Sequence, residues 1–153
     1  MIRLTLSLLS LAVILTLIPL NSSAATLKNI PSKEYSKQWE VVVGKADSDE
    51  PKLNKSSKPD LYSVFSLDVK NIGDENIKLI RVEAYRDEPN STTQYELFTV
   101  DYEDEQALYP SFHHHNFPLY TKAKELKVII TWTKKSEKND HQRKFREQFV
   151  FQQ

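Results

Sequence analysis

The sequence predicts an all-β fold in which two antiparallel sheets pack face to face. Three observations support this prediction. Apolar and polar side chains alternate at every second residue, proline and turn-forming residues lie between the alternating runs, and no segment shows a convincing helical period. Because a single sheet with this pattern would leave one apolar face in water, a second layer has to cover it.

The chain begins with a segment that is typical of a secretory signal peptide. Arg3 and the amino terminus give a positive start, Leu4 to Leu20 holds twelve apolar residues and no charge, and small residues follow. We therefore expect residues 1–25 to be a signal peptide that is cleaved after Ala24 or Ala25. A retained membrane anchor is the alternative, because this run is at the lower edge of the ~17–25 residues that span a bilayer.

Residues 26–38 are expected to be a lead-in, and residues 39–153 a single β-sandwich domain. Polar residues dominate from 45 to 60, where Asp, Ser and Pro predict a mobile loop, as a disordered connector or a binding loop. The alternating runs predict buried faces made of Trp39, Val41 and Val43; Leu61, Phe65, Leu67 and Val69; Ile80, Val82 and Ala84; Phe98, Val100 and Tyr102; Val128, Ile130 and Trp132; and Phe145, Phe149 and Phe151.

Turn chemistry lies between these runs. The segment from Asn71 to Asn76 contains Gly73, and glycine and asparagine tolerate the positive backbone angles of a tight reversal. Pro89-Asn90-Ser91 and the polar residues 136–140 are further predicted turns. The six prolines that follow the leader all lie outside the proposed strand interiors, as expected for an all-β domain.

The residues around this turn carry a family resemblance. The strand that ends in Val69-Lys70, followed by Asn71-Ile72-Gly73 and a second strand, resembles a hairpin of bacterial extracytoplasmic immunoglobulin-like domains. The late strand with Trp132 and the Phe-rich last strand are similar to the end of such domains. The resemblance implies an immunoglobulin-like antiparallel β-sandwich of about seven strands. It implies no active site, and the cysteine pair of antibody domains is missing.

Composition narrows the function classes. Twenty-one basic and twenty-one acidic residues cancel, and no polybasic tract indicates a nucleic-acid partner. The chain has no cysteine, which in an exported domain of this size favours a bacterial source. It has two glycines, so glycine-rich phosphate loops are excluded, and the usual hydrolase motifs are missing. We therefore expect no enzymatic activity, no catalytic residues and no cofactor.

One cluster could carry metal chemistry, His113-His114-His115. On a strand, His113 and His115 would share a face and could converge on one divalent metal while His114 points away. Such a site needs a third ligand, for which Glu103, Asp104 or His141 are possible donors. The alternative is an edge strand or loop whose imidazoles are solvated or stack on nearby aromatic rings.

Together these features predict a secreted or cell-envelope protein of bacterial origin. We expect a non-catalytic immunoglobulin-like module for protein interaction or an envelope-associated structural role. Its partner would be an unidentified protein or component of the cell envelope, with no nucleic acid and no stable membrane insertion after the leader is removed. The alternative function is extracytoplasmic metal binding through the His113-His115 cluster.

Overall fold

The computed structural model describes residues 24–102, 111–135 and 143–153, and these residues form the all-β fold that the sequence predicts. A short 3-10 helix, η1 (Pro51–Asn54), lies between the third and fourth strands. The strands in chain order are β1 (Ala25–Thr26), β2 (Ser32–Tyr35), β3 (Trp39–Lys45), β4 (Tyr62–Asn71), β5 (Ile77–Asp87), β6 (Gln94–Asp101), β7 (Ser111–Tyr120), β8 (Glu125–Lys134) and β9 (Lys144–Gln152).

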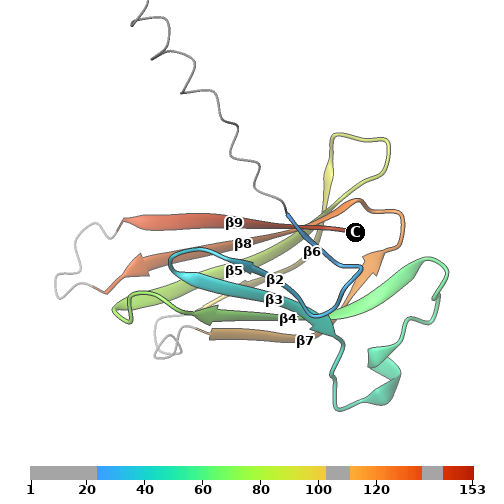
Figure 1. Cartoon of the computed structure of the whole chain (residues 1–153), viewed down its shortest axis with the longest axis horizontal. Coiled ribbons are helices and arrows are strands. Elements are labelled where there is room, and N and C mark those ends of the chain that lie inside the picture. The colour runs from blue at the N-terminus through green and yellow to red at the C-terminus, as the bar shows by residue number, and fades with distance from the viewer. Residues whose placement is uncertain (1–23, 103–110, 136–142) are drawn as a thin grey trace, which may run out of the picture.

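The strands form two sheets, ordered β1-β9-β8-β5-β6 and β2-β3-β4-β7. Figure 1 shows these two layers, with the loop between β3 and β4 extending from one end of the molecule. Neighbouring strands pair antiparallel except for β1, which lies parallel to β9. Trp39 of one sheet meets Trp132 of the other edge to face, with ring centroids 6.5 Å apart. The predicted second layer is therefore present, and it covers the apolar face of the first.

The predicted alternation places most of the expected side chains in this core. Trp39, Val41 and Val43 of β3 are fully buried, while the residues between them are partly exposed. The inward faces of the other long strands supply the rest of the buried cluster, which includes Phe65, Leu67, Val69, Val82, Ala84, Val128, Ile130, Trp132, Phe149 and Phe151. Burial of each large apolar side chain contributes roughly 1.5–3 kcal/mol.

Phe98, Val100, Tyr102 and Phe145 are only partly buried and pack against this core. Two further positions differ from the predicted pattern. Ile80 is only partly buried, because the pairing of β5 with β8 shifts between Leu79 and Arg81 and Ile80 becomes the extra residue of a β-bulge. Residues before the bulge therefore have the opposite phase, and Ile77 and Leu79 enter the core. Leu61 lies outside β4 and is 39% exposed, so it does not share the buried face of Phe65.

The segment from Asn71 to Asn76 does not form the hairpin that the sequence predicts. It connects β4 to β5, which belong to different sheets, and Gly73 does not have a positive φ. Glycine is needed here for space, since an added Cβ would lie 2.6 Å from the carbonyl oxygen of Lys37. The predicted turn at Asn90 is confirmed, with φ of 63° between the antiparallel strands β5 and β6.

The lead-in of residues 26–38 contributes to both layers. β2 pairs with β3, β1 pairs with β9, and Leu27 is buried in the core. These two short strands account for the difference between nine described strands and the seven or so that were predicted. The predicted turn at residues 136–140 lies outside the described residues, and so do residues 1–23 of the predicted signal peptide. Its last two residues are described, and Ala25 begins β1.

Candidate metal site

The strand β7 presents two of its three histidines on one face, as the sequence predicts. His113 and His115 are exposed and their rings meet edge to face, with centroids 4.4 Å apart. His114 points the other way and stacks on Phe98, with ring centroids 4.3 Å apart. The period of two in the strand backbone therefore separates one imidazole from the pair.

A β-bulge in β7 allows this arrangement beside a regular core. Between the pair Phe65–Phe117 and the pair Leu67–His114, β4 advances two residues while β7 advances three. His115 and Phe117 are two residues apart, so a regular strand would place them on the same face. The extra residue reverses this phase, and His115 faces outward while Phe117 is buried. β7 is an edge strand, which also explains how it accommodates Pro118 in its interior.

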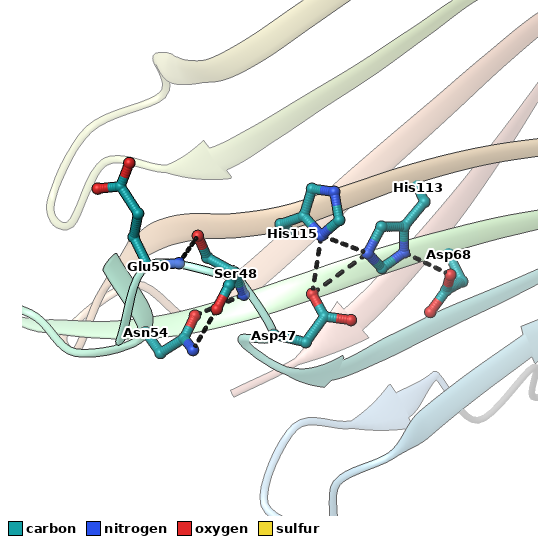
Figure 2. A network of polar contacts seen from close by, with 7 residues as sticks. All are labelled: Asp47, Ser48, Glu50, Asn54, Asp68, His113 and His115. Atoms are coloured by element: carbon teal, nitrogen blue, oxygen red, sulfur yellow. Dashed lines mark hydrogen bonds and ion pairs between the residues drawn. The ribbon is translucent and has the colours of Figure 1, made fainter. Parts of the chain in front are cut away.

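The loop of residues 45–60 brings a carboxylate to the two imidazoles. The backbone N–H of Asp47 donates to the carbonyl of His115 at 3.0 Å, which holds the start of the loop against β7. Further along, the N–H of Ser48 donates to Oδ1 of Asn54 at 2.6 Å, and Nδ2 of Asn54 donates back to the carbonyl of Ser48 at 2.9 Å. Figure 2 shows this network between η1 and the histidines.

Asp68 holds His113 from the opposite side. It is the cross-strand partner of His113 in the β4–β7 ladder, and its Oδ1 lies 2.6 Å from Nδ1 of the imidazole. An ionised carboxylate can only accept, so Nδ1 carries the proton of this hydrogen bond. In the neutral imidazole the lone pair is then on Nε2, which faces Asp47 and His115. A carboxylate on the far nitrogen is the usual support of a metal-ligating histidine.

Three donor atoms converge at this point. Nε2 of His113 lies 3.1 Å from Nδ1 of His115 and 3.2 Å from Oδ1 of Asp47. Nδ1 of His115 lies 3.4 Å from Oδ1 of Asp47, so the three atoms form a triangle. A tetrahedral zinc ion with bonds of ~2.0–2.1 Å separates its ligand atoms by about 3.3–3.4 Å. The triangle therefore has nearly the dimensions of one face of a zinc tetrahedron. All three side chains are exposed, so the fourth position is open to solvent.

The electrostatics of the triangle favour a positive charge. Partial burial works to lower the pKa of His113, but the hydrogen bond and charge of Asp68, together with Asp47, outweigh it and raise the pKa. When Nδ1 of His115 carries the ring proton, it can donate to Nε2 of His113 or to Asp47, and a metal ion would have to replace that proton. A proton and a metal ion therefore compete for the same place.

His114 has the opposite environment. Burial against the aromatic rings lowers its pKa, and the charges of His113 and His115 lower it further. Its ring lies near Phe112 and Phe117 as well as Phe98. The predicted alternative, in which an imidazole stacks on aromatic rings, thus describes His114, whereas the other two histidines form the site.

The third ligand was not predicted from the sequence. Glu103, Asp104 and His141 were the predicted donors, and all three lie outside the described residues. Asp47 is 66 positions from His113 and lies in a polar loop, so no local pattern connects the two. The only signal was the Asp-rich composition of a loop that was already a candidate binding segment.

The fold and the family comparison define the class of protein. The described residues form a two-sheet β domain, and none of their helices is long and apolar enough to cross a bilayer. A model of the YozF-like secreted protein family matches residues 23–153, and the chain belongs to this family. The expectation of a bacterial protein outside the cytoplasm is thereby confirmed.

A curated relative is the "Uncharacterized protein YozF" of Bacillus subtilis strain 168. It is 33% identical to this chain over 129 residues, and the match covers 74% of this chain and 75% of the relative. No solved structure matches the chain.

Proposed function

We propose that this protein is a secreted, non-catalytic, immunoglobulin-like module that binds a divalent transition metal through Asp47, His113 and His115. The observation that supports it is the triangle of donor atoms with sides of 3.1, 3.2 and 3.4 Å, backed by Asp68. Metal binding was the alternative that the sequence left open. The geometry makes it the better-supported function, because a third ligand and a supporting carboxylate now join the two imidazoles.

Strand order supports the immunoglobulin-like part of the proposal. One sheet contains β3, β4 and β7 in that order, and the other contains β9, β8, β5 and β6. These are the orders of strands A, B, E and of strands G, F, C, C′ in immunoglobulin-type domains. The short strands β1 and β2 extend the two sheets at the opposite edge. The buried tryptophans Trp39 and Trp132 replace the missing disulfide as the contact between layers.

Imidazole and carboxylate donors favour zinc, nickel or copper over magnesium or calcium, which prefer oxygen ligands. The open fourth position can hold a water molecule or a ligand atom from a protein or envelope partner. Catalytic metal sites need a dry, shaped cavity around the ion, whereas this triangle lies on an exposed strand face. Binding, rather than catalysis, is therefore the proposed role.

Calorimetric titration of the untagged secreted protein with zinc tests the proposal. We expect one ion per chain, and we expect both His113→Ala and Asp47→Asn to weaken binding by a factor of ten or more. His114→Phe is the matched control, because it removes an imidazole from the same strand on the face turned away from the site. Equal zinc affinity in the wild type and the His113→Ala, His115→Ala double variant would refute the proposed site.

A further inference from the structure

A second site lies on the same face of the sheet as the histidines, further along β7. Val64 and Pro118 are cross-strand partners that face away from the core, since their neighbours Phe65 and Phe117 are buried. With Asn116 they form the floor of a cavity of about 880 Å³. The loop after η1 and residues of β6 form its walls. This volume is in the range of pockets that enclose small organic molecules, roughly 300–1,000 Å³.

The walls of this cavity combine cations with apolar side chains. Its lining includes four basic residues and one acid, Glu96. The basic residues are Lys52, Lys55, Lys58 and Arg86. Within the described part of the chain, none of the three lysines forms an ion pair. Their charges are therefore available to a ligand, and the field in the cavity favours an anion.

Arg86 is a fixed residue of the cavity lining, and its charge is already paired with Glu88. Its side chain is almost fully buried at 8% exposure, and Nη1 donates to Glu88 at 2.5 Å and to the carbonyl of Asp87 at 3.0 Å. The guanidinium also lies over the ring of Tyr95, 4.5 Å from its centroid. These contacts hold Arg86 and Tyr95 in place before any ligand arrives, which reduces the ordering cost of binding.

The apolar lining is unusually exposed. Leu53 of η1 is 48% exposed and Tyr95 is 56% exposed, and both line the cavity together with Val64 and Leu97. A purely polar anion would leave these groups in contact with water. A ligand that carries an apolar body as well as its charge would cover them.

We propose that this cavity binds a small anionic amphiphile, a molecule with one acidic group on an apolar chain or ring. The acidic group pairs with the lysines of the loop, and the apolar body covers Leu53, Tyr95 and the floor formed by Val64 and Pro118. The proposal does not depend on the metal site, because none of the three metal ligands lines the cavity.

Calorimetry on the EDTA-treated secreted protein tests this inference with decanoate as the probe. Decanol has the same chain without the charge, and decyltrimethylammonium has the opposite charge. We expect decanoate to bind at least tenfold more tightly than either. Equal binding of all three would reduce the cavity to a nonspecific apolar surface and overturn the proposal, and so would the absence of decanoate binding.

Charge reversal then locates the site. We expect the Lys55→Glu, Lys58→Glu double variant to bind decanoate at least tenfold more weakly, because the reversed charges repel the carboxylate. Both side chains are exposed, so their replacement leaves the fold intact. Lys28→Glu, an exposed lysine that does not line the cavity, is the matched control and should not change the affinity. Unchanged affinity in the double variant would overturn the assignment. Binding of a polyglutamate peptide without a response to decanoate would assign the cavity to acidic polypeptides instead.

Discussion

Asp68 determines what His113 can do near neutral pH. It accepts a hydrogen bond from Nδ1 at 2.6 Å, so it fixes the tautomer and aims Nε2 at His115 and Asp47. The same carboxylate raises the pKa of His113 against the opposing effect of partial burial. One side chain therefore strengthens both the ligand character of the imidazole and its attraction for a proton.

The pH dependence of this residue has a definite sign. A raised pKa in the folded state means that His113 stabilises the metal-free protein below about pH 6.5, the ordinary histidine value, and that this contribution is lost as the pH rises through the folded pKa. Zinc needs the neutral imidazole, so its affinity changes in the opposite direction and increases with pH.

We therefore predict a specific effect of Asp68→Asn on zinc binding. At pH 8 the affinity should fall about tenfold, because the support of His113 is weakened. The midpoint of the rise in zinc affinity with pH should move downward, because the group that chiefly raises the pKa of His113 has lost its charge. Zinc titrations from pH 5.5 to 8 measure both effects. A variant profile that superimposes on the wild type would show that Asp68 does not act on the site.

At the scale of elements, the connection between β4 and β5 illustrates how a glycine can be required for space. Gln38 is buried beside this connection, and its amide donates to Asn71 Oδ1 at 2.5 Å and to the carbonyl of Asp74 at 3.0 Å. The N–H of Asp74 donates back to Oε1 of Gln38 at 3.3 Å. The segment that crosses between the sheets is thus docked on the turn before β3, and Gly73 fits in the contact.

We predict that Gly73→Ala destabilises the fold by about 1–3 kcal/mol, as overpacking does elsewhere. The new methyl group would lie 2.6 Å from the carbonyl oxygen of Lys37 and 2.8 Å from Oε1 of Gln38, so the docked segment would have to shift. Ile72→Ala is the control, since Ile72 is 46% exposed and its loss should cost less than about 0.5 kcal/mol. Urea unfolding compares the variants. Equal midpoints for Gly73→Ala and the wild type would contradict the steric argument.

At the scale of the whole molecule, the loop of residues 45–60 joins the two proposed sites. Asp47 at its start belongs to the metal site, and Lys52, Lys55 and Lys58 line the cavity. The hydrogen bonds between Ser48 and Asn54 connect the start of the loop to η1. A ligand that orders one part of this loop therefore reduces the ordering cost of the other.

We predict that zinc and decanoate bind with positive coupling. Saturating zinc should raise the affinity for decanoate about fivefold or more, and decanoate should raise the affinity for zinc by the same factor, because the coupling free energy is reciprocal. Calorimetric titrations of decanoate with and without zinc measure the factor. Magnesium is the control, because a site with two imidazoles does not favour it. Independent binding of the two ligands would show that the loop does not transmit the effect.

Much of the fold was predictable because it follows from local periodicity. Alternation with a period of two reflects the geometry of a strand, so Trp39, Val41 and Val43 could be placed in a core from their spacing alone. The same geometry placed His113 and His115 on one face. Ile80 was misplaced because a bulge adds one residue to the period, and the pairing partner that creates the bulge is distant in sequence.

The sequence by itself determined that this chain builds alternating strands, that its composition suits an exported protein without cysteine, and that two imidazoles emerge on the same side. Only the tertiary structure decided which sheet each strand joins, that Asp47 and Asp68 flank His113, and that the loop encloses a cationic cavity. The physical reason is the range of the interactions. Side-chain direction along a strand depends on neighbouring residues, whereas the meeting of residues 47, 68 and 113 depends on strand pairing and on the path of the loop across the sheet.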